Sequence, residues 1–282
     1  MEILQSNVTK KQIDNFIASQ KQSLGLFAPN GFGKFTIAKF IASKILKTEN
    51  ISNNPNILII KPDEKGNILV DEVRRIVAFI KLKTASKQKT SRIIIIKNAE
   101  LLTETVQNLL LKPLEEPPGD VLVILCANST QSMLSTVLSR IDIINLTAPE
   151  ISQVKQYFSE GFSVEQIEKS WIIAQGRVGL FCSILNNSDH PLLEQITLAK
   201  KFISYNPYQK TIAIGDLAKE NLVTFLDALL LVAESGFYNS LKNDSQQYLF
   251  WHKLRKSTLQ AIKEYQAKAN SKLILTKLVV NL

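Results

Sequence analysis

The stretch that decides the fold is residues 24–38, which read LGLFAPNGFGKFTIA. An apolar run leads into a glycine-rich turn and then into a helical pattern, as in a strand, a phosphate-binding loop and a helix. Such a loop has the pattern G-x-x-x-x-G-K-[ST]. Its backbone N–H groups surround the phosphates, its lysine reaches the β- and γ-phosphates, and its hydroxyl binds Mg²⁺. Gly31, Gly33 and Lys34 fit this chemistry, so they are our candidate nucleotide-binding residues.

Two positions of this loop depart from the pattern. Ala28 stands where the first glycine belongs, and Phe35 stands where the Mg²⁺-binding hydroxyl belongs. Thr36 follows one residue late, so on a helix its hydroxyl points roughly 100° away from the required direction. The sequence therefore predicts a degenerate loop that binds ATP weakly at most.

A second pair of positions also lacks the groups that handle magnesium. A hydrolytic P-loop enzyme carries an acidic pair at the end of a buried strand, where it holds Mg²⁺ and polarises water. The apolar run Ile93–Ile96 is followed here by Lys97 and Asn98, and an ammonium repels a metal ion. Glu100 is three residues too late for this role, and we expect it to be exposed. Because phosphoryl transfer depends on positioning and charge stabilisation, the sequence predicts no ATP hydrolysis at this site.

Apolar runs alternate with helical patterns over roughly the first 150 residues. This alternation predicts an α/β domain, a parallel sheet with helices on both faces. The strand-like runs are residues 23–27, 57–60, 93–96, 121–126 and 141–146. After residue 149 the pattern is helical almost throughout, with Pro207 and Gly215 as the main breaks. We expect a nucleotide-fold domain (1–148), a small helical lid (149–190) and an all-helical end domain (191–282).

Composition limits the partners, metal sites and location that the sequence allows. The net charge of +9 favours polyanionic partners without choosing among nucleic acid, acidic protein and membrane surface. Cys126 and Cys182 cannot form a four-ligand zinc site, and His190 and His252 have no nucleophile motif beside them. We find neither a signal-peptide pattern nor an apolar run of about 18 residues, so we expect a cytoplasmic protein without metal or membrane contact.

Several later segments match the motifs of one protein family. Lys112–Pro118 fits a K-x-L-E-E-P-P run, with Pro113 as a departure, and Ser139-Arg140 fits an S-R-C turn, with Ile141 in place of cysteine. Taken in order, these segments resemble the delta-prime branch of the bacterial clamp-loader family of AAA+ proteins. Gly176–Gly179 resembles the lid helix, and Asn270–Leu278 resembles the last helix of the family's collar domain. The family usually carries a four-cysteine zinc module between the P-loop helix and the next strand, where this sequence has no cysteine, so we expect no zinc.

This resemblance implies a function. In the family, the arginine of the S-R-C turn projects into the ATP site of a neighbouring subunit as an arginine finger. We therefore expect Arg140 to act catalytically in trans and to reach outward, with Ser139 beside it. The implied partners are ATPase subunits of the gamma/tau type and a delta-type subunit in a hetero-oligomeric ring. Through the ring they include the sliding clamp and primer–template DNA. The implied collar, 191–282, holds the ring together.

Two other functions remain open from the sequence. The first is an active AAA+ ATPase of DNA replication or repair that tolerates Phe35 and Lys97. The second is a P-loop-derived module that binds DNA outside clamp loading. The substitutions at Phe35 and Lys97 speak against the first, and the likeness of the C-terminal segments to a collar speaks against the second.

Overall fold

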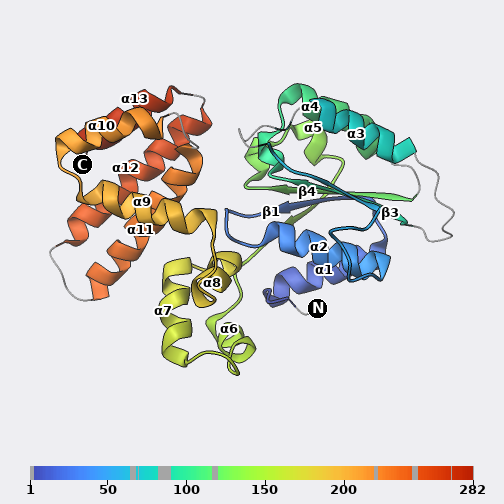
Figure 1. The fold of residues 1–282 in the computed structure, drawn as a ribbon, viewed down its shortest axis with the longest axis horizontal. Helices are drawn as coiled ribbons and strands as arrows, with labels where there is room; N and C mark the ends of the chain where they lie inside the picture. Colours follow the sequence, from blue (N-terminus) through green and yellow to red (C-terminus); the bar gives the residue numbers. More distant parts are fainter. Residues whose placement is uncertain are drawn as a thin grey trace. The chain divides into compact units, whose positions relative to one another are not determined.

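The computed structural model describes residues 3–63, 68, 70–81, 90–115, 120–218, 222–242, 247–267 and 269–281. Contacts divide the chain into two compact units, Met1–Tyr157 and Phe158–Leu282 (Figure 1). The first unit is α/β and the second is helical, which confirms the expected fold class. The separation of lid from collar at residue 190 stays a prediction.

The strands that the structure describes form one parallel sheet in the order β2-β3-β4-β1-β5. Because all strands run the same way, their carboxyl ends meet at one end of the sheet and their amino ends at the opposite end. All of the expected strands are present: β1 (Ser23–Phe27), β2 (Ile57–Ile60), β3 (Arg92–Lys97), β4 (Val121–Ala127) and β5 (Asp142–Asn145). β2 is an outer strand of the sheet, and three of its four residues are only half-buried.

Helices cover both faces of this sheet, and the side chains of β3 and β4 alternate between them (Figure 1). Ile93 and Ile95 face α1 (Asn7–Ser19) and α2 (Lys34–Leu46), whereas Ile94 and Ile96 face the other layer. That second layer contains α3 (Val70–Lys81), η1 (Ala99–Leu101), α4 (Glu104–Glu115) and α5 (Ser135–Leu138). The four isoleucines are fully buried, because a central parallel strand contacts an apolar layer on each side.

Gly25 of β1 is required by close packing. A Cβ atom there would lie 2.5 Å from the ring of Phe27 and 2.8 Å from Cδ1 of Ile141. The glycine therefore lets the Phe27 ring and Ile141 pack directly against the centre of the strand. Both side chains belong to the core beneath α4 and α5.

The second unit is helical throughout its described residues. Its helices are α7 (Val164–Ala174), α8 (Val178–Leu185), α9 (Pro191–Ser204), α10 (Pro207–Leu217), α11 (Leu222–Lys242), α12 (Tyr248–Gln266) and α13 (Ser271–Val280), while α6 (Ile151–Tyr157) belongs to the first unit. Pro207 begins α10, as a proline at a first helical turn does. The break expected at Gly215 is wrong, because Gly215 lies inside α10. A single glycine costs a helix only about 1 kcal/mol, which neighbouring residues offset.

Helix α11 is long and apolar enough, by length and composition alone, to cross a membrane over Leu222–Leu241. Two acidic side chains interrupt that stretch, and both are paired within the unit. Asp227 pairs with Arg177, and Glu234 pairs with Arg255. Alanines and leucines of α11 are buried where it packs against α9 and α12, so we describe it as the central helix of this unit.

Candidate functional site

The phosphate-binding loop keeps its characteristic backbone. Gly31 and Gly33 have φ angles of 86° and 83°, in the left-handed region that favours glycine. Gly33 is the N-cap of α2, and no atom lies within 4 Å of a Cβ placed on it. The loop thus follows the carboxyl end of β1 and delivers the chain into α2, as the sequence predicted.

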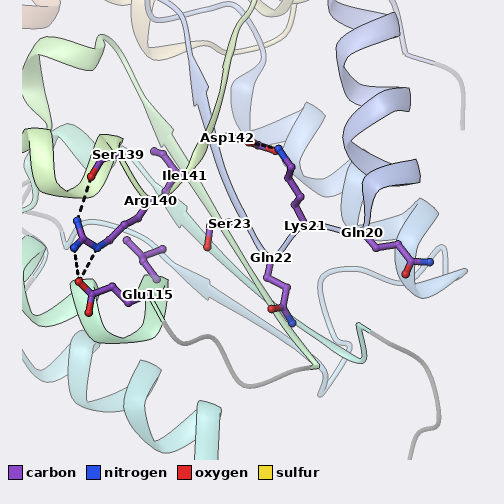
Figure 2. Close-up of a pocket in the computed structure, with 10 residues that line it drawn as sticks. Gln20, Lys21, Gln22, Ser23, Glu115, Ser139, Arg140, Ile141 and Asp142 are labelled. Carbon is purple, nitrogen blue, oxygen red and sulfur yellow. Dashed lines mark hydrogen bonds and ion pairs between the residues drawn. The ribbon is translucent and has the colours of Figure 1, made fainter.

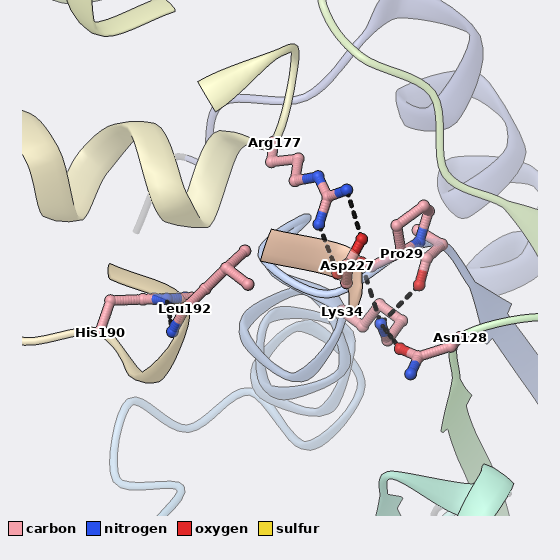
Figure 3. Close-up of polar contacts among 8 residues, drawn as sticks. Pro29, Lys34, Asn128, Arg177, His190, Leu192 and Asp227 are labelled. Atoms are coloured by element: carbon pink, nitrogen blue, oxygen red, sulfur yellow. Dashed lines mark hydrogen bonds and ion pairs between the residues drawn. The ribbon is translucent and has the colours of Figure 1, made fainter. Parts of the chain in front are cut away.

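Lys34 is bound by its own chain. Its Nζ donates to the carbonyl oxygens of Ala28 and Pro29 at 2.5 and 3.1 Å, and to Oδ1 of Asn128 at 2.9 Å (Figure 3). Asn128 follows β4, so the lysine connects the loop to the neighbouring strand end. The three acceptors take up the donor capacity of the ammonium group, which a nucleotide phosphate would otherwise use.

The corner where a P-loop enzyme binds magnesium is occupied by an aromatic ring with two lysine ammonium groups close to it. Phe35 is half-buried, and the Nζ atoms of Lys39 and Lys97 lie 4.7 and 5.6 Å from its ring centroid. Both distances suit a cation–π contact. Mg²⁺ requires oxygen ligands in octahedral geometry, and neither a phenyl ring nor an ammonium group supplies one. The residues at this corner therefore do not fit a nucleotide-bound magnesium ion.

Glu100 is the sequence prediction that the structure overturns here. It was expected to be exposed, but the turn η1 directs it inward, and its Oε2 is buried without a hydrogen-bond partner among the described residues. Burial raises the pKa of its carboxyl group. The backbone N–H groups of Glu100 and Asn128, the charge of Lys34 and the amide of Asn98 partly oppose this effect. A carboxylate therefore lies near Lys34, on the side away from solvent.

Arg140 lies at the opposite end of the sheet, where the amino ends of the strands meet, just before β5, and it contacts its own chain rather than reaching outward as expected. Its Nε and Nη2 lie 2.7 and 2.5 Å from Oε1 of Glu115, the last residue of α4 (Figure 2). Its Nη1 donates to the carbonyl of Thr136 at 2.8 Å and to Oγ of Ser139 at 3.1 Å. Ser139 ends α5 and donates in turn to the Thr136 carbonyl.

The loop and Arg140 are separated by the length of β1. Leu24 pairs with Asp142 of β5, so Arg140 lies beside the amino end of β1, whereas Lys34 lies beyond its carboxyl end. Five residues of strand span about 16 Å. The sequence-predicted site residues thus form two groups, one at the carboxyl ends of the strands and one at the amino ends. Arg140 does not reach the loop of its own chain.

The helical unit contains a buried ion pair that was not expected from the sequence. Arg177, at the start of α8, donates from Nη1 and Nη2 to the two carboxylate oxygens of Asp227, both at 2.7 Å (Figure 3). Only 8% and 18% of these side chains are exposed. Nearby, Nε2 of Gln175 donates to the carbonyl of Leu231. These contacts fix the α7–α8 corner to α11, and no local pattern signals them because about 50 residues separate the partners.

His190 caps a helix, and Cys126 and Cys182 are free thiols. Nδ1 of His190 accepts the N–H of Leu192 and caps α9 (Figure 3). Cys126 is buried in β4, which raises the pKa of its thiol to about 12, and burial also raises the pKa of the Cys182 thiol. No cluster of three or more potential metal ligands occurs among the residues that the structure describes. The absence of zinc stays a prediction.

Comparison with known proteins decides the family. The family model described as "DNA polymerase III, delta subunit" matches residues 5–150, just over half of the chain. The chain belongs to the DNA polymerase III delta-subunit family. The match covers nearly the whole α/β unit, including the degenerate loop, Glu100 and the Ser139-Arg140 turn. It confirms the resemblance to clamp-loader AAA+ proteins on which the sequence interpretation depended.

Individual relatives agree with this assignment. The DNA polymerase III subunit delta′ of Haemophilus influenzae is 29% identical over 151 residues, which are 54% of this chain and 42% of that protein. The corresponding subunit of Yersinia pestis is 30% identical over 41% of this chain and 34% of its own length. Replication factor C subunit 3 of Bos taurus is 25% identical over 40% of this chain and 32% of its own length. Each match spans less than half of the relative's length.

Solved structures extend the likeness to the fold of the whole chain. A DNA polymerase III gamma subunit-related protein of Thermotoga maritima aligns with a TM-score of 0.54 at 15% identity, covering 95% of this chain and 97% of its own. A point mutant of RuvB from Thermotoga maritima aligns with a TM-score of 0.50 at 16% identity, over 71% of this chain and 66% of its own. At these identities the likeness shows the fold alone, an AAA+ fold followed by helices.

Proposed function

We propose that this delta-family chain is an ATPase-silent subunit of a clamp loader and that it supplies Arg140 to the ATP site of a neighbouring subunit. In this proposal the chain acts in the cytoplasm, within a hetero-oligomeric ring that includes ATPase subunits of the gamma/tau type and a delta-type subunit. The ring places a sliding clamp on primer–template DNA. The chain itself needs neither a metal ion nor a bound nucleotide for this role.

The observation that carries the silent half of the proposal is the corner around Phe35. Catalysis of phosphoryl transfer consists mostly of positioning the phosphates and neutralising developing charge, for which Mg²⁺ is central. Phe35 fills the position of the metal-binding hydroxyl, and Lys39 and Lys97 contact the ring from nearby. Lys34 is already bound by the loop and Asn128. The corner thus lacks metal ligands, and its lysine is engaged.

The position of Arg140 supports action in trans. It lies about one strand length, roughly 16 Å, from the loop of its own subunit, so it cannot stabilise a phosphate bound there. It is nevertheless one-third exposed at the rim of a hollow, where a second chain can approach. An arginine placed this way suits a site completed by two subunits, since its planar fork can span phosphate oxygens.

Exposed apolar side chains on the helical unit support assembly with other subunits. They lie on α10 and α13 and at the ends of α11 and α12 that are joined in sequence, and they include Tyr208, Ile212, Leu273, Val280, Tyr238, Leu241 and Leu249. Tyr208 and Val280 are 75% and 79% exposed. Apolar side chains as exposed as these are available for contact with other subunits. This supports the proposed role of residues 191–282 as the collar.

The proposal is tested by ATP turnover with and without the ring. The isolated chain should not hydrolyse ATP, whereas the reconstituted complex should do so in response to clamp and DNA. Arg140→Ala should leave assembly unchanged but remove about 10³–10⁵-fold of activity at the one site that it serves, so total turnover falls in part. Turnover by the isolated chain at the rate of an active subunit refutes the silent role. Unchanged turnover and clamp loading in an assembled Arg140→Ala complex refutes the finger.

A further inference from the structure

We propose that Glu115 is a latch, which holds Arg140 against its own subunit until the phosphate of a neighbouring chain competes for the guanidinium. This inference rests on the proposed function of Arg140. Oε1 of Glu115 accepts a hydrogen bond from Nε of Arg140 and lies 2.5 Å from Nη2, and Nη1 donates to Thr136 and Ser139. Within the described part of the chain, Nε and Nη1 are therefore hydrogen-bonded, and Nη2 is held by the ion pair. In this conformation the guanidinium is bound within its own chain and is not directed at a neighbouring subunit.

The latch is weak enough to open. The Arg140 and Glu115 side chains are 33% and 46% exposed, whereas those of the buried pair Arg177–Asp227 are 8% and 18% exposed. Water and salt screen an exposed pair, so such a pair shifts an equilibrium by at most about fivefold. An arginine finger speeds phosphoryl transfer by about 10³–10⁵-fold, which is stabilisation of the transition state. Once a partner brings its phosphate within reach, that stabilisation exceeds the Glu115 contact by a wide margin, and releasing Arg140 from Glu115 still adds to the barrier.

The structure also provides room for the movement. A hollow of about 500 Å³ adjoins the pair, lined by Gln20–Ser23, Leu114 and Ser139–Asp142 (Figure 2). A second ion pair, Lys21 to Asp142 at 2.7 Å, borders the same hollow. Arg140 can leave Glu115 by rotating its own side chain over this space. The backbone of the turn stays in place, since Arg140 N–H remains bonded to the carbonyl of Val137.

Removing the charge of the latch should release the arginine. Glu115→Gln keeps the size of the side chain but exchanges a carboxylate for an amide, which holds a guanidinium less strongly. In the isolated chain, phenylglyoxal should then modify Arg140 up to about fivefold faster, as measured by peptide mass spectrometry. Arg74, 80% exposed, and Arg177, 8% exposed, serve as fast and slow internal references.

A matched control is available on α3. Glu72 pairs with Arg75 at 2.8 Å in another exposed pair of the same two residue types. Glu72→Gln should speed the modification of Arg75 and leave that of Arg140 unchanged. An unchanged rate at Arg140 in Glu115→Gln, with the control responding, overturns the latch.

The assembled complex provides the second readout. Glu115→Gln should raise clamp- and DNA-stimulated ATP turnover, by up to about fivefold at the site that Arg140 serves, because less of the arginine is bound within its own chain. The same substitution should have no effect in an Arg140→Ala background, since the two residues then have no interaction to lose. A decrease in turnover by Glu115→Gln overturns the latch, because Glu115 would then help to present the arginine. If Arg140→Ala itself is without effect, the finger fails, while the labelling rates still decide whether Glu115 restrains Arg140.

Discussion

The ammonium of Lys97 lies 5.6 Å from the ring centroid of Phe35, so a strand-end cation faces an aromatic ring where an active P-loop enzyme would hold its metal. The two substitutions are 62 residues apart in sequence and contact each other in the fold. They therefore form one replaced corner rather than two separate losses. Replacing only one of these two residues leaves the other at the position where Mg²⁺ would bind.

The corner should respond to reversal of both residues together. Phe35→Thr restores a hydroxyl and Lys97→Asp restores a carboxylate, so the double variant should bind a non-hydrolysable ATP analogue more tightly in Mg²⁺ than in EDTA. Each single variant should show little difference between the two conditions. Calorimetric titration measures this difference. Equal affinity of the double variant with and without Mg²⁺ would contradict our interpretation of the corner.

Lys34 should contribute to stability rather than to ligand binding. Lys34→Met retains the apolar stem but removes the donor to Ala28, Pro29 and Asn128, so the free energy of unfolding should fall by about 1–3 kcal/mol. Lys10→Met, on an exposed position of α1, is the control and should change it by less than about 0.5 kcal/mol. Urea unfolding measures both. Equal stabilities of the two variants would show that the Lys34 contacts are energetically idle.

Glu100 should make stability depend on pH. Burial raises the pKa of its carboxyl group above the ordinary value of 4.5, so the folded state binds its proton more tightly than the unfolded state does. The stability that this contributes is fully present below pH 4.5 and is lost as the pH rises through the folded-state pKa. Glu100→Gln, which carries no charge, should therefore be more stable than wild type at pH 7, and the gap should shrink towards pH 4. Urea midpoints at both pH values test this, and a gap that is independent of pH would disprove it.

Asp227 should be among the most sensitive positions of the helical unit. Asp227→Ala leaves the buried guanidinium of Arg177 without its partner, which should cost about 3–5 kcal/mol of unfolding free energy. Glu234→Ala, on the same helix, removes an exposed partner of Arg255 and should cost about 1 kcal/mol or less. Similar losses in the two variants would show that burial does not set the strength of these pairs.

Two glycines in helices should respond oppositely to alanine. A Cβ on Gly236 would overlap the ring of Trp251, so Gly236→Ala should destabilise the chain by about 1–3 kcal/mol and alter tryptophan fluorescence. No atom lies within 4 Å of a Cβ on Gly215, so Gly215→Ala should stabilise α10 by about 0.5–1 kcal/mol. Thermal unfolding distinguishes the two. Equal shifts would mean that helix propensity, not packing, controls Gly236.

Most of the α/β unit could be predicted from local patterns. The four-residue run Ile93–Ile96 and the fully apolar β4 indicate strands that are covered on both faces, and the loop at Gly31–Lys34 indicates a parallel sheet. The position of β2 at the sheet edge could not be predicted, because strand order depends on which elements pair across the sheet. Glu100 was predicted wrongly because a turn of three residues, η1, directs a charged side chain inward without changing the hydrophobic pattern.

The candidate site was predicted in its residues but not in its contacts. Arg140 and Glu115 both lie in segments that resemble the family, and nothing in their 25-residue separation indicates that they form a pair. The pair of Arg177 and Asp227 was missed for the same reason. Such contacts follow from how helices pack, and packing is decided by the whole core rather than by neighbours in sequence.

The loop lies at the carboxyl ends of the strands and Arg140 at their amino ends, so the subunit has two chemically different sides. Proteins that join through two different surfaces associate head to tail, and each member then has a giving side and a receiving side. In the proposed assembly, a member with Arg140 but with Phe35 and Lys97 at its loop supplies an arginine to its neighbour and has no competent ATP site of its own. It therefore stands at one end of the row of competent ATP sites. It completes the site of the neighbour on its Arg140 side and forms no competent site with the neighbour on its loop side.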